Sequence, residues 1–524
     1  MISRMPNLKQ FFKSINQDIS WSIFLLLSAL ILYLIGLGDL PLRDWDEGYY
    51  GTVAKDIYKS GNWLYMTYHD EPFLLKPPLI IWLINISYLI FGISEFTTRL
   101  PCAFLTACGV PLLYLIGKNI FSSRLPAILG TLVYLTLLPM VRHGRLAMLD
   151  GPINTFFLFS IFCLFQSFYQ HLWIIGVGIG LGLIAFTKGI LVIALGGILA
   201  IFCIFNKSLI FFKDPVFWVG FILGFFPVIL WYPLQIIEYG EKFIKVHFLQ
   251  QNFDRLSQAV EGNQGSVWYY IIELIKYSFP WLLFLPGGLI LAIKKYQQSW
   301  AKLVLIGFIL FIGIISLMRT KLPWYVLPVY PFFSLAVGAY LAEIIRNNYQ
   351  FYPKILGSLL IVGSLASLAG GVYFSIKTND FQILTLSILI GITFALSYVN
   401  FLLNNHNFIF TLFVGLYLSL SIFVRSDLWI WELNESFPVK PVATLIQENT
   451  PPNTVIYTSY AYSRTSLDFY SDRQVIAQNL EELKKSAAIS FYFLLDPLTL
   501  EKLNLNKYKI LGNTQDFILI KKSR

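Results

Sequence analysis

Charged residues are scarce in this chain. Asp, Glu, Lys and Arg make up 13% of its 524 residues, whereas ordinary soluble domains contain about 25%. Hydrophobic residues make up 56%, and they recur in runs long enough to cross a lipid bilayer. The composition therefore excludes a soluble globular protein and predicts an all-α polytopic membrane protein.

Cysteine is also rare, and the four cysteines lie within or beside apolar runs, without the spacing of a metal site. The sequence therefore predicts no disulfide framework. A glycine-rich nucleotide loop and an Asp-x-Asp motif are missing, which disfavours a nucleotide-sugar substrate. We expect no cofactor, and the sequence leaves a divalent metal ion open without supporting one.

The net charge of +10 does not indicate a nucleic-acid partner. Residues 427–524 contain eleven basic and eleven acidic side chains, so this tail is neutral. The basic excess lies in short segments between apolar runs, where Lys and Arg set the orientation of a membrane protein. We expect membrane lipids, and not nucleic acid, around the chain.

Thirteen apolar runs predict about 13 transmembrane helices. The first run lacks a small-residue cleavage site and is predicted to be an uncleaved span. A further run, 79–91, is short and is predicted to lie on the outer face without crossing. The thirteen runs are 21–38, 100–117, 125–141, 152–168, 172–186, 190–206, 215–234, 279–293, 303–318, 324–345, 355–376, 381–402 and 407–425.

Orientation follows from the positive-inside rule. If 79–91 does not cross and the N-terminus is cytoplasmic, the inner segments hold twelve Lys or Arg and only two acidic residues. We therefore expect a multi-pass protein of the bacterial plasma (inner) membrane. Two larger outer segments, 39–99 and 235–278, would face the periplasm or exterior.

The tail differs in character from the rest of the chain. A transmembrane domain is predicted over 1–426, and a small α/β domain over 427–524 on the outer face. Short β-branched and aromatic runs at 454–458, 490–495 and 517–520 predict strands. Residues 479–487 predict a short helix.

Charged side chains cluster where the outer segments meet the apolar runs. Asp46 and Glu47 follow the first span, and Lys76 stands before two prolines. Such charges near a bilayer are costly unless something uses them. Asp46, Glu47 and Asp150 are therefore candidates for the chemistry, although ordinary pairing at the membrane interface also explains single charged residues.

These residue types suit transfer of a sugar from a lipid phosphate. The leaving phosphate gains negative charge, which fixed cations stabilise, and a carboxylate can accept the proton of an acceptor hydroxyl. The predicted donor-phosphate residues are Lys76, Arg145, Lys188, Lys321 and Tyr325. The predicted residues of the substrate cavity are Tyr50, Trp63, Asn252 and Arg255.

Several motifs resemble, in order, those of the bacterial GT-C membrane glycosyltransferases of family 39, which include aminoarabinose transferases and protein O-mannosyltransferases. The likeness covers about 1–345. The motifs are Asp46-Glu47-x-x-Tyr50, Gly61-Asn62-Trp63, Lys76-Pro77-Pro78-Leu79-x-x-Trp82, Arg145 to Asp150, Thr187-Lys188-Gly189 and Lys321-Leu322-Pro323-x-Tyr325.

This resemblance implies a GT-C fold, a polyprenyl-phosphate-linked sugar donor and an inverting transfer on the periplasmic side. It implies Asp46 as the catalytic base, Lys76 on the donor phosphate and Asp150 as a second acid, with Lys321 and Tyr325 near the same cavity. The acceptor would be lipid A-like, a glycan or a protein.

Two places depart from the pattern of the aminoarabinose transferases. Leu75 stands where they often have an acid, and Gln251-Asn252 where they often have a Glu-His pair. A metal ion held by such a pair is therefore not expected, and we predict no metal-binding residues in this chain.

Two other classes remain open from the residues alone. A lipid or polysaccharide transporter or flippase would favour internal repeats and acids at mid-span, and neither pattern is visible. A polysaccharide polymerase or ligase would share the chemistry without the Asp-Glu and Lys-Pro-Pro order.

Overall fold

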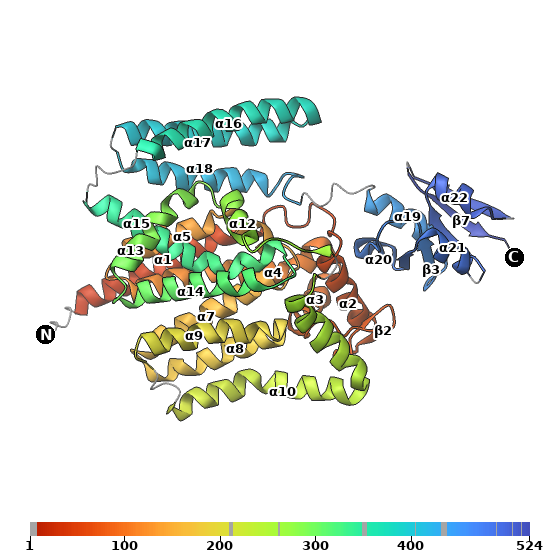
Figure 1. Ribbon diagram of the computed structural model, residues 1–524, viewed down its shortest axis with the longest axis horizontal. Coiled ribbons are helices and arrows are strands. Elements are labelled where there is room, and N and C mark those ends of the chain that lie inside the picture. The colour runs from red at the N-terminus through yellow and green to blue at the C-terminus, as the bar shows by residue number, and fades with distance from the viewer. Residues whose placement is uncertain are drawn as a thin grey trace.

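The protein is a helical membrane body with a small α/β domain at one end (Figure 1). The computed structural model describes residues 8–208, 213–259, 262–347, 354–403, 405–430, 438–488, 490–505, 507–514 and 516–523. Most helices of the body run along the long axis of the molecule, and the described N-terminal helix begins at the end opposite the α/β domain. The predicted fold class is confirmed.

The helical body is built from helices of very unequal length, which fall into an N-terminal and a C-terminal set. The first set is α1 (Leu8–Leu34), α2 (Asp46–Ser60), α3 (Leu79–Phe91), α4 (Glu95–Ile120), α5 (Arg124–Leu135), α6 (Leu138–Arg145), α7 (Asp150–Ser167), α8 (Ile174–Lys188) and α9 (Leu191–Phe205). The second set is α10 (Pro215–Phe243), α11 (Asp254–Ser257), α12 (Tyr269–Tyr277), α13 (Leu285–Lys294), α14 (Ser299–Leu317), α15 (Tyr330–Asn347), α16 (Lys354–Thr378), α17 (Phe381–Leu402) and α18 (Asn407–Phe423).

Several helices are long and apolar enough to cross a bilayer. Within the described ranges there are eight, or up to ten if each of two bent helix pairs, α5 with α6 and α12 with the helix that follows it, forms one span. Three shorter apolar helices, α3, α9 and α18, accompany them. The count of thirteen spans stays a prediction, while the polytopic architecture is established.

Helix α3 corresponds to the run that was predicted not to cross. Its 13 residues extend about 20 Å at 1.5 Å per residue, whereas the hydrocarbon core is about 30 Å thick. Gly92 ends the helix with a φ of 79°. The length of α3 favours a helix that lies at the membrane boundary.

The second segment that was predicted to be outer, 235–278, is far more helical than its polar sequence indicates. Helix α10 continues to Phe243 and is followed by the π-helix η3 (Ile244–Phe253) and by α11. At Gly240 the backbone leaves the helix with a φ of 53°, which glycine tolerates because it has no Cβ. The chain turns there, so that η3 folds back over the helical body.

Helices α8 and α10 are held at close range by facing glycines. A Cβ at Gly182 would lie 2.1 Å from the carbonyl oxygen of Gly224, and one at Gly178 would lie 2.3 Å from backbone atoms of Gly220 and Phe221. Small residues spaced by four allow membrane helices to approach backbone to backbone. This contact fixes α10, and through it the place of η3.

The C-terminal domain contains one five-stranded mixed sheet in the order β4-β3-β5-β7-β6. Strands β4, β3 and β5 are parallel, whereas β5, β7 and β6 are antiparallel. The three predicted strands and the predicted helix are confirmed. The elements are α19 (Val439–Asn449), β3 (Val455–Thr458), α20 (Thr465–Ser471), β4 (Gln474–Ala477), α21 (Leu480–Ser486), β5 (Tyr492–Leu495), α22 (Pro497–Leu503), β6 (Tyr508–Asn513) and β7 (Ile518–Lys522).

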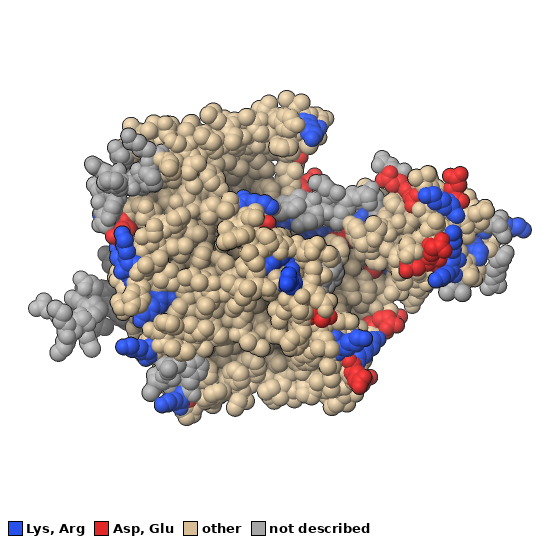
Figure 2. Space-filling model, in the orientation of Figure 1, with Lys and Arg blue, Asp and Glu red and all other residues tan. Residues whose placement is uncertain are grey.

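Charge is distributed unevenly over the surface. On the face shown in Figure 2 most of the helical body is uncharged, whereas the C-terminal domain has many acidic and basic side chains. Figure 1 places this domain beside α2 and the short hairpin of β1 (Thr67–Tyr68) and β2 (Glu71–Pro72). An uncharged belt with a charged domain at one end fits a membrane-embedded body.

Replacing Gly224 with valine tests the glycine contact. Any β-branched side chain must push α10 away from α8, and overpacking of this kind costs about 1–3 kcal/mol. We expect a lower melting temperature for the purified protein. Gly370→Val in α16 is the control because a Cβ there meets nothing within 4 Å; equal melting temperatures for the two variants would contradict the close-packing argument.

Candidate active site

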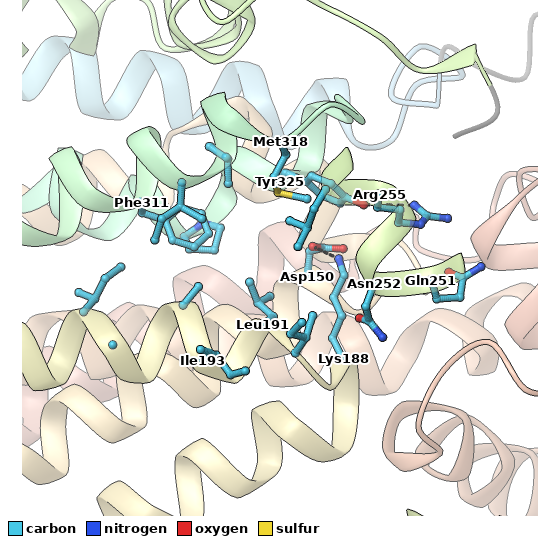
Figure 3. Close-up of a pocket in the computed structure, with 18 of the residues that line it drawn as sticks. Asp150, Lys188, Leu191, Ile193, Gln251, Asn252, Arg255, Phe311, Met318 and Tyr325 are labelled. Carbon is cyan, nitrogen blue, oxygen red and sulfur yellow. Dashed lines mark hydrogen bonds and ion pairs between the residues drawn. The ribbon is translucent and has the colours of Figure 1, made fainter. Parts of the chain in front are cut away.

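One large cavity joins an apolar groove to a polar end. Its volume is about 460 Å³, and Figure 3 shows the apolar side chains along α9 and α14 and the polar side chains gathered near Asp150 and Lys188. The polar lining residues are Lys76, Asp150, Lys188, His247, Gln251, Asn252, Arg255 and Tyr325.

The apolar part of the cavity is lined by side chains of α9 and α14. Ile193, Ile198 and Ile201 of α9 face Phe311 and Ile314 of α14 across it. Ile193 is 71% exposed, which is costly in water and natural in a bilayer. The groove therefore suits a hydrocarbon chain that enters from the membrane.

Lys188 and Asp150 form the centre of the polar end. The Lys188 Nζ donates to the Asp150 Oδ1 over 2.7 Å and lies 4.9 Å from the centre of the Tyr325 ring. Arg255 donates to the Tyr325 hydroxyl over 3.1 Å. Two cations and a phenol are thus held around one carboxylate, as Figure 3 shows.

Lys76 reaches the same end from the first outer segment. Its Nζ donates to the Gln251 Oε1 over 2.8 Å. Burial, together with the positive charges of Arg255 and Lys188, lowers the pKa of Lys76 to about 7. A lysine held among like charges gains most from an anion, because a phosphate would restore its protonated form.

The π-helix η3 supplies one wall of the polar end. His247 shares hydrogen bonds with the Leu74 carbonyl (2.9 Å) and the Tyr232 hydroxyl (3.0 Å), and Asn252 donates to the His247 carbonyl over 2.6 Å. π-helices occur often at functional sites. His247 and Gln251 were not predicted as site residues, although their spacing of four would have placed them on one face of any helix.

Asp46 stands at the start of α2, close to the cavity but not among the described residues that line it. It is partly exposed and lies within electrostatic reach of Lys76, Asp150 and Lys188. Burial and the neighbouring Asp46 raise the pKa of Tyr50 well above its usual value. The two predicted acids, Asp46 and Asp150, thus meet around the same cations.

Glu47 has a different environment from its neighbour Asp46. Its side chain is fully buried and forms a bidentate ion pair with Arg99, at 2.9 and 2.8 Å. The backbone N–H groups of Arg43 and Ala147 also donate to it. Burial would raise its pKa, but Arg99 and these donors hold the pKa below its usual value, so Glu47 stays ionised and joins three segments.

Three other predicted residues, like Tyr50, lie outside the described lining of the cavity. Arg145 donates to the carbonyls of Leu32 (2.6 Å) and Val424 (3.1 Å). The Lys321 Nζ donates to the carbonyls of Ile315 and Ser316. Arg145 thus binds the C-terminal ends of α1 and α18, and Lys321 binds the C-terminal end of α14. The third, Trp63, accepts a hydrogen bond through its carbonyl from Trp82 Nε1 at 2.8 Å.

Among the described residues, no group of three or more His, Cys, Asp or Glu side chains could hold a metal ion. The four cysteines are unpaired and lie in the helical body. The described lining of the polar end has three basic side chains, Lys76, Lys188 and Arg255, and one carboxylate, Asp150, with Asp46 close by. Its chemistry is that of an anion site beside a base.

Comparisons with known proteins agree with this geometry. Residues 75–232 match the family model described as dolichyl-phosphate-mannose-protein mannosyltransferase. A crystal structure of ArnT from Cupriavidus metallidurans bound to undecaprenyl phosphate superposes with a TM-score of 0.79 at 17% identity, covering 96% of this chain and 98% of that one. The archaeal oligosaccharyltransferase AglB from Archaeoglobus fulgidus gives a TM-score of 0.52 at 11% identity, covering 92% of this chain and 69% of that one.

Sequence relatives include an uncharacterized protein of Aquifex aeolicus, 25% identical over 89% of this chain and 90% of its own length. The undecaprenyl phosphate-alpha-4-amino-4-deoxy-L-arabinose arabinosyl transferase of Yersinia pestis is 27% identical over 66% of this chain. The alignment spans 64% of that transferase's length.

The fold, the family-model match and these relatives identify the chain as a membrane glycosyltransferase of the GT-C class. These matches agree with the resemblance to family 39 that the motifs in the first half of the sequence carry.

Glu47→Gln tests whether Glu47 has a structural role that differs from the role of the adjacent Asp46. The change leaves Arg99 buried without a charged partner, which costs about 3–5 kcal/mol, so we expect a large fall in melting temperature and in folded yield. Asp46→Asn is the matched control and should melt like the wild type. A Glu47→Gln protein that folds normally and lacks only activity would instead make Glu47 a catalytic residue.

Proposed function

We propose that the protein transfers a sugar from a polyprenyl-phosphate donor to a hydroxyl acceptor on the extracytoplasmic face of the plasma membrane. The acceptor classes are a lipid A-like molecule, a glycan or a protein side chain. Asp46 serves as the general base, and the transfer inverts the anomeric configuration. No metal ion or other cofactor is part of the proposal.

The observation that supports this proposal most strongly is the form of the cavity. A groove between α9 and α14 ends at Lys76, Lys188 and Arg255. A polyprenyl phosphate has the same two parts, a hydrocarbon chain and an anionic head. An apolar groove that ends at a partly buried cluster of cations fits both parts of such a molecule.

The relatives support the same substrate class. The arabinosyl transferase of Yersinia pestis is named for an undecaprenyl phosphate-linked sugar, and the ArnT crystal structure contains undecaprenyl phosphate. The family model is named for a dolichyl phosphate-linked sugar. These proteins share the lipid phosphate and differ in sugar and acceptor.

The proposed reaction is a single displacement at the anomeric carbon. The acceptor oxygen forms the new bond as its proton passes to the Asp46 carboxylate, and the bond to the phosphate oxygen breaks with its electron pair on the leaving phosphate. Lys76, Lys188 and Arg255 stabilise the charge that develops there. Asp150 holds Lys188 in place through their 2.7 Å contact.

The orientation proposed here follows from charge. The short segments assigned to the inside contain twelve Lys or Arg and two acidic residues, and the positive-inside rule places them in the cytoplasm. The C-terminal domain and the polar end of the cavity then face the periplasm. In that compartment nucleoside triphosphates are not needed, because the phosphate ester of the donor is already activated.

Asp46→Asn is the primary test. Purified protein in lipid would be given a panel of radiolabelled polyprenyl-phosphate sugars and membrane-extract acceptors. Because a positioned base contributes about 10²–10⁴-fold to rate, we expect label transfer to fall by that factor while donor binding is retained. Near wild-type transfer by a folded Asp46→Asn protein would sink the assignment of the base.

The depressed pKa of Lys76 predicts a pH-dependent affinity for undecaprenyl phosphate. Above pH 7 the free site holds increasingly neutral Lys76, while the phosphate remains a dianion because its second pKa is about 6. Binding must then take up a proton, so we expect affinity to weaken by up to about tenfold per unit between pH 7.5 and 9.5.

Lys76→Arg is the control for this titration, because a guanidinium stays protonated throughout the range. Its binding curve should be nearly flat from pH 7.5 to 9.5. A flat curve for the wild-type protein would contradict the combination of a lowered Lys76 pKa and a contact between Lys76 and the phosphate.

A further inference from the structure

The residue before Asp46 has an unusual backbone. Trp45 caps α2 with a φ of 68° and a ψ of −121°, a region that non-glycine residues rarely occupy. Such strain costs of the order of 1–3 kcal/mol and persists only where surrounding contacts enforce it. The contacts that enforce it here come from a remote part of the chain.

The C-terminal domain binds both sides of Trp45. Arg464 donates to the Asp44 Oδ2 over 2.7 Å, and the Ser466 backbone N–H and hydroxyl both donate to the Asp44 Oδ1. Thr465 donates through its Oγ1 to the Trp45 carbonyl over 3.0 Å. Asp44 and Arg464 are 1% and 3% exposed, so this ion pair is shielded from water and from salt.

Helices α2 and α20 are in backbone contact next to Asp46. A Cβ at Gly48 would lie 2.5 Å from the Ser466 nitrogen and 2.6 Å from the Thr465 Oγ1. Only glycine allows the first turn of α2 to approach the first turn of α20 so closely. The contact thus lies within one turn of Asp46, on the helix that presents it.

Further contacts fix the direction of α2 along the domain. At its C-terminal end Lys55 and Lys59 pair with Asp472 at 2.7 and 2.9 Å. Beyond the helix, Tyr68 of the β1–β2 hairpin donates to the buried Asp468. The domain therefore contacts α2 at both ends, and the fully buried contacts are those beside Asp46.

We infer that Arg464, Thr465 and Ser466 are positioning residues for catalysis, which hold Asp44 and Trp45 so that Asp46 meets the acceptor hydroxyl at the donor phosphate. The inference rests on the proposed function and assigns the C-terminal domain a part in it. None of the three residues is among the described residues that line the cavity, so they act through the backbone of residues 44–46.

The energetics of positioning set the size of the expected effect. A displacement of about 1 Å at the reacting atoms costs of the order of 10²-fold in rate. Donor binding depends on Lys76, Lys188 and Arg255 and on the apolar groove. The three positioning residues of the C-terminal domain are not among the described residues that line this cavity. Loss of the contact should therefore lower kcat and leave the donor KM unchanged.

Steady-state kinetics of Arg464→Met and Thr465→Val in the full-length protein test the positioning role. We expect kcat to fall about 10- to 100-fold for Arg464→Met and less for Thr465→Val, with donor KM and undecaprenyl phosphate Kd as in wild type. Arg464→Lys retains the charge and should recover part of the rate. Lys59→Ala is the matched control, because it removes a contact to the same domain at the far end of α2.

Hydrogen exchange supplies a readout that needs no activity. Deuterium uptake of a peptide covering residues 42–52 should rise in Arg464→Met and Thr465→Val and not in Lys59→Ala. Unchanged uptake and unchanged kcat beside an active wild type would overturn the positioning role alone. Full transfer by Asp46→Asn, or no transfer by the wild type with any donor, would overturn the proposed function and with it the inferred role of the domain.

Discussion

The Glu47–Arg99 ion pair connects the first outer segment to the helical body. Both side chains are fully buried, and two backbone N–H groups complete the coordination of the carboxylate. An unpaired charge in such a place would cost several kcal/mol, so the start of α2, the N-terminal part of α4 and the segment before α7 must stay together. Asp46 and Asp150 belong to these same segments, and their approach to one cavity depends on this pair.

The described lining of the cavity, unlike the Glu47–Arg99 pair, has more basic than acidic side chains. Lys76, Lys188 and Arg255 share hydrogen bonds with an amide, a carboxylate and a phenol, which leaves net positive charge beside an apolar groove. Burial and the cationic neighbours lower the pKa of Lys76 to about 7, so a bound anion would favour its protonated form. A site that stores such repulsion is suited to an anion, and the strained Trp45 nearby is a second sign of functional constraint.

Much of the architecture could be predicted, because its causes are local. Apolar runs of spanning length define the helices, and β-branched runs in the tail define β3, β5 and β7. The helical character of η3 was missed, since its polar side chains do not follow a simple apolar period. Arg145 and Lys321 were predicted at the donor phosphate from their charge and from the family motifs. In the structure both donate to backbone carbonyls at helix ends.

By itself the sequence determined the membrane class, three of the strands in the tail and the residue types of a lipid-phosphate transferase, because composition, periodicity and ordered motifs are properties of neighbouring residues. Only the tertiary structure decided which charges meet. Glu47 and Asp46 are adjacent in the chain, yet Glu47 is fully buried against Arg99 and Asp46 is partly exposed near the cavity. Asp44 pairs with Arg464, which is 420 residues away in the sequence. Burial and pairing across such separations depend on helix packing, which no local pattern encodes.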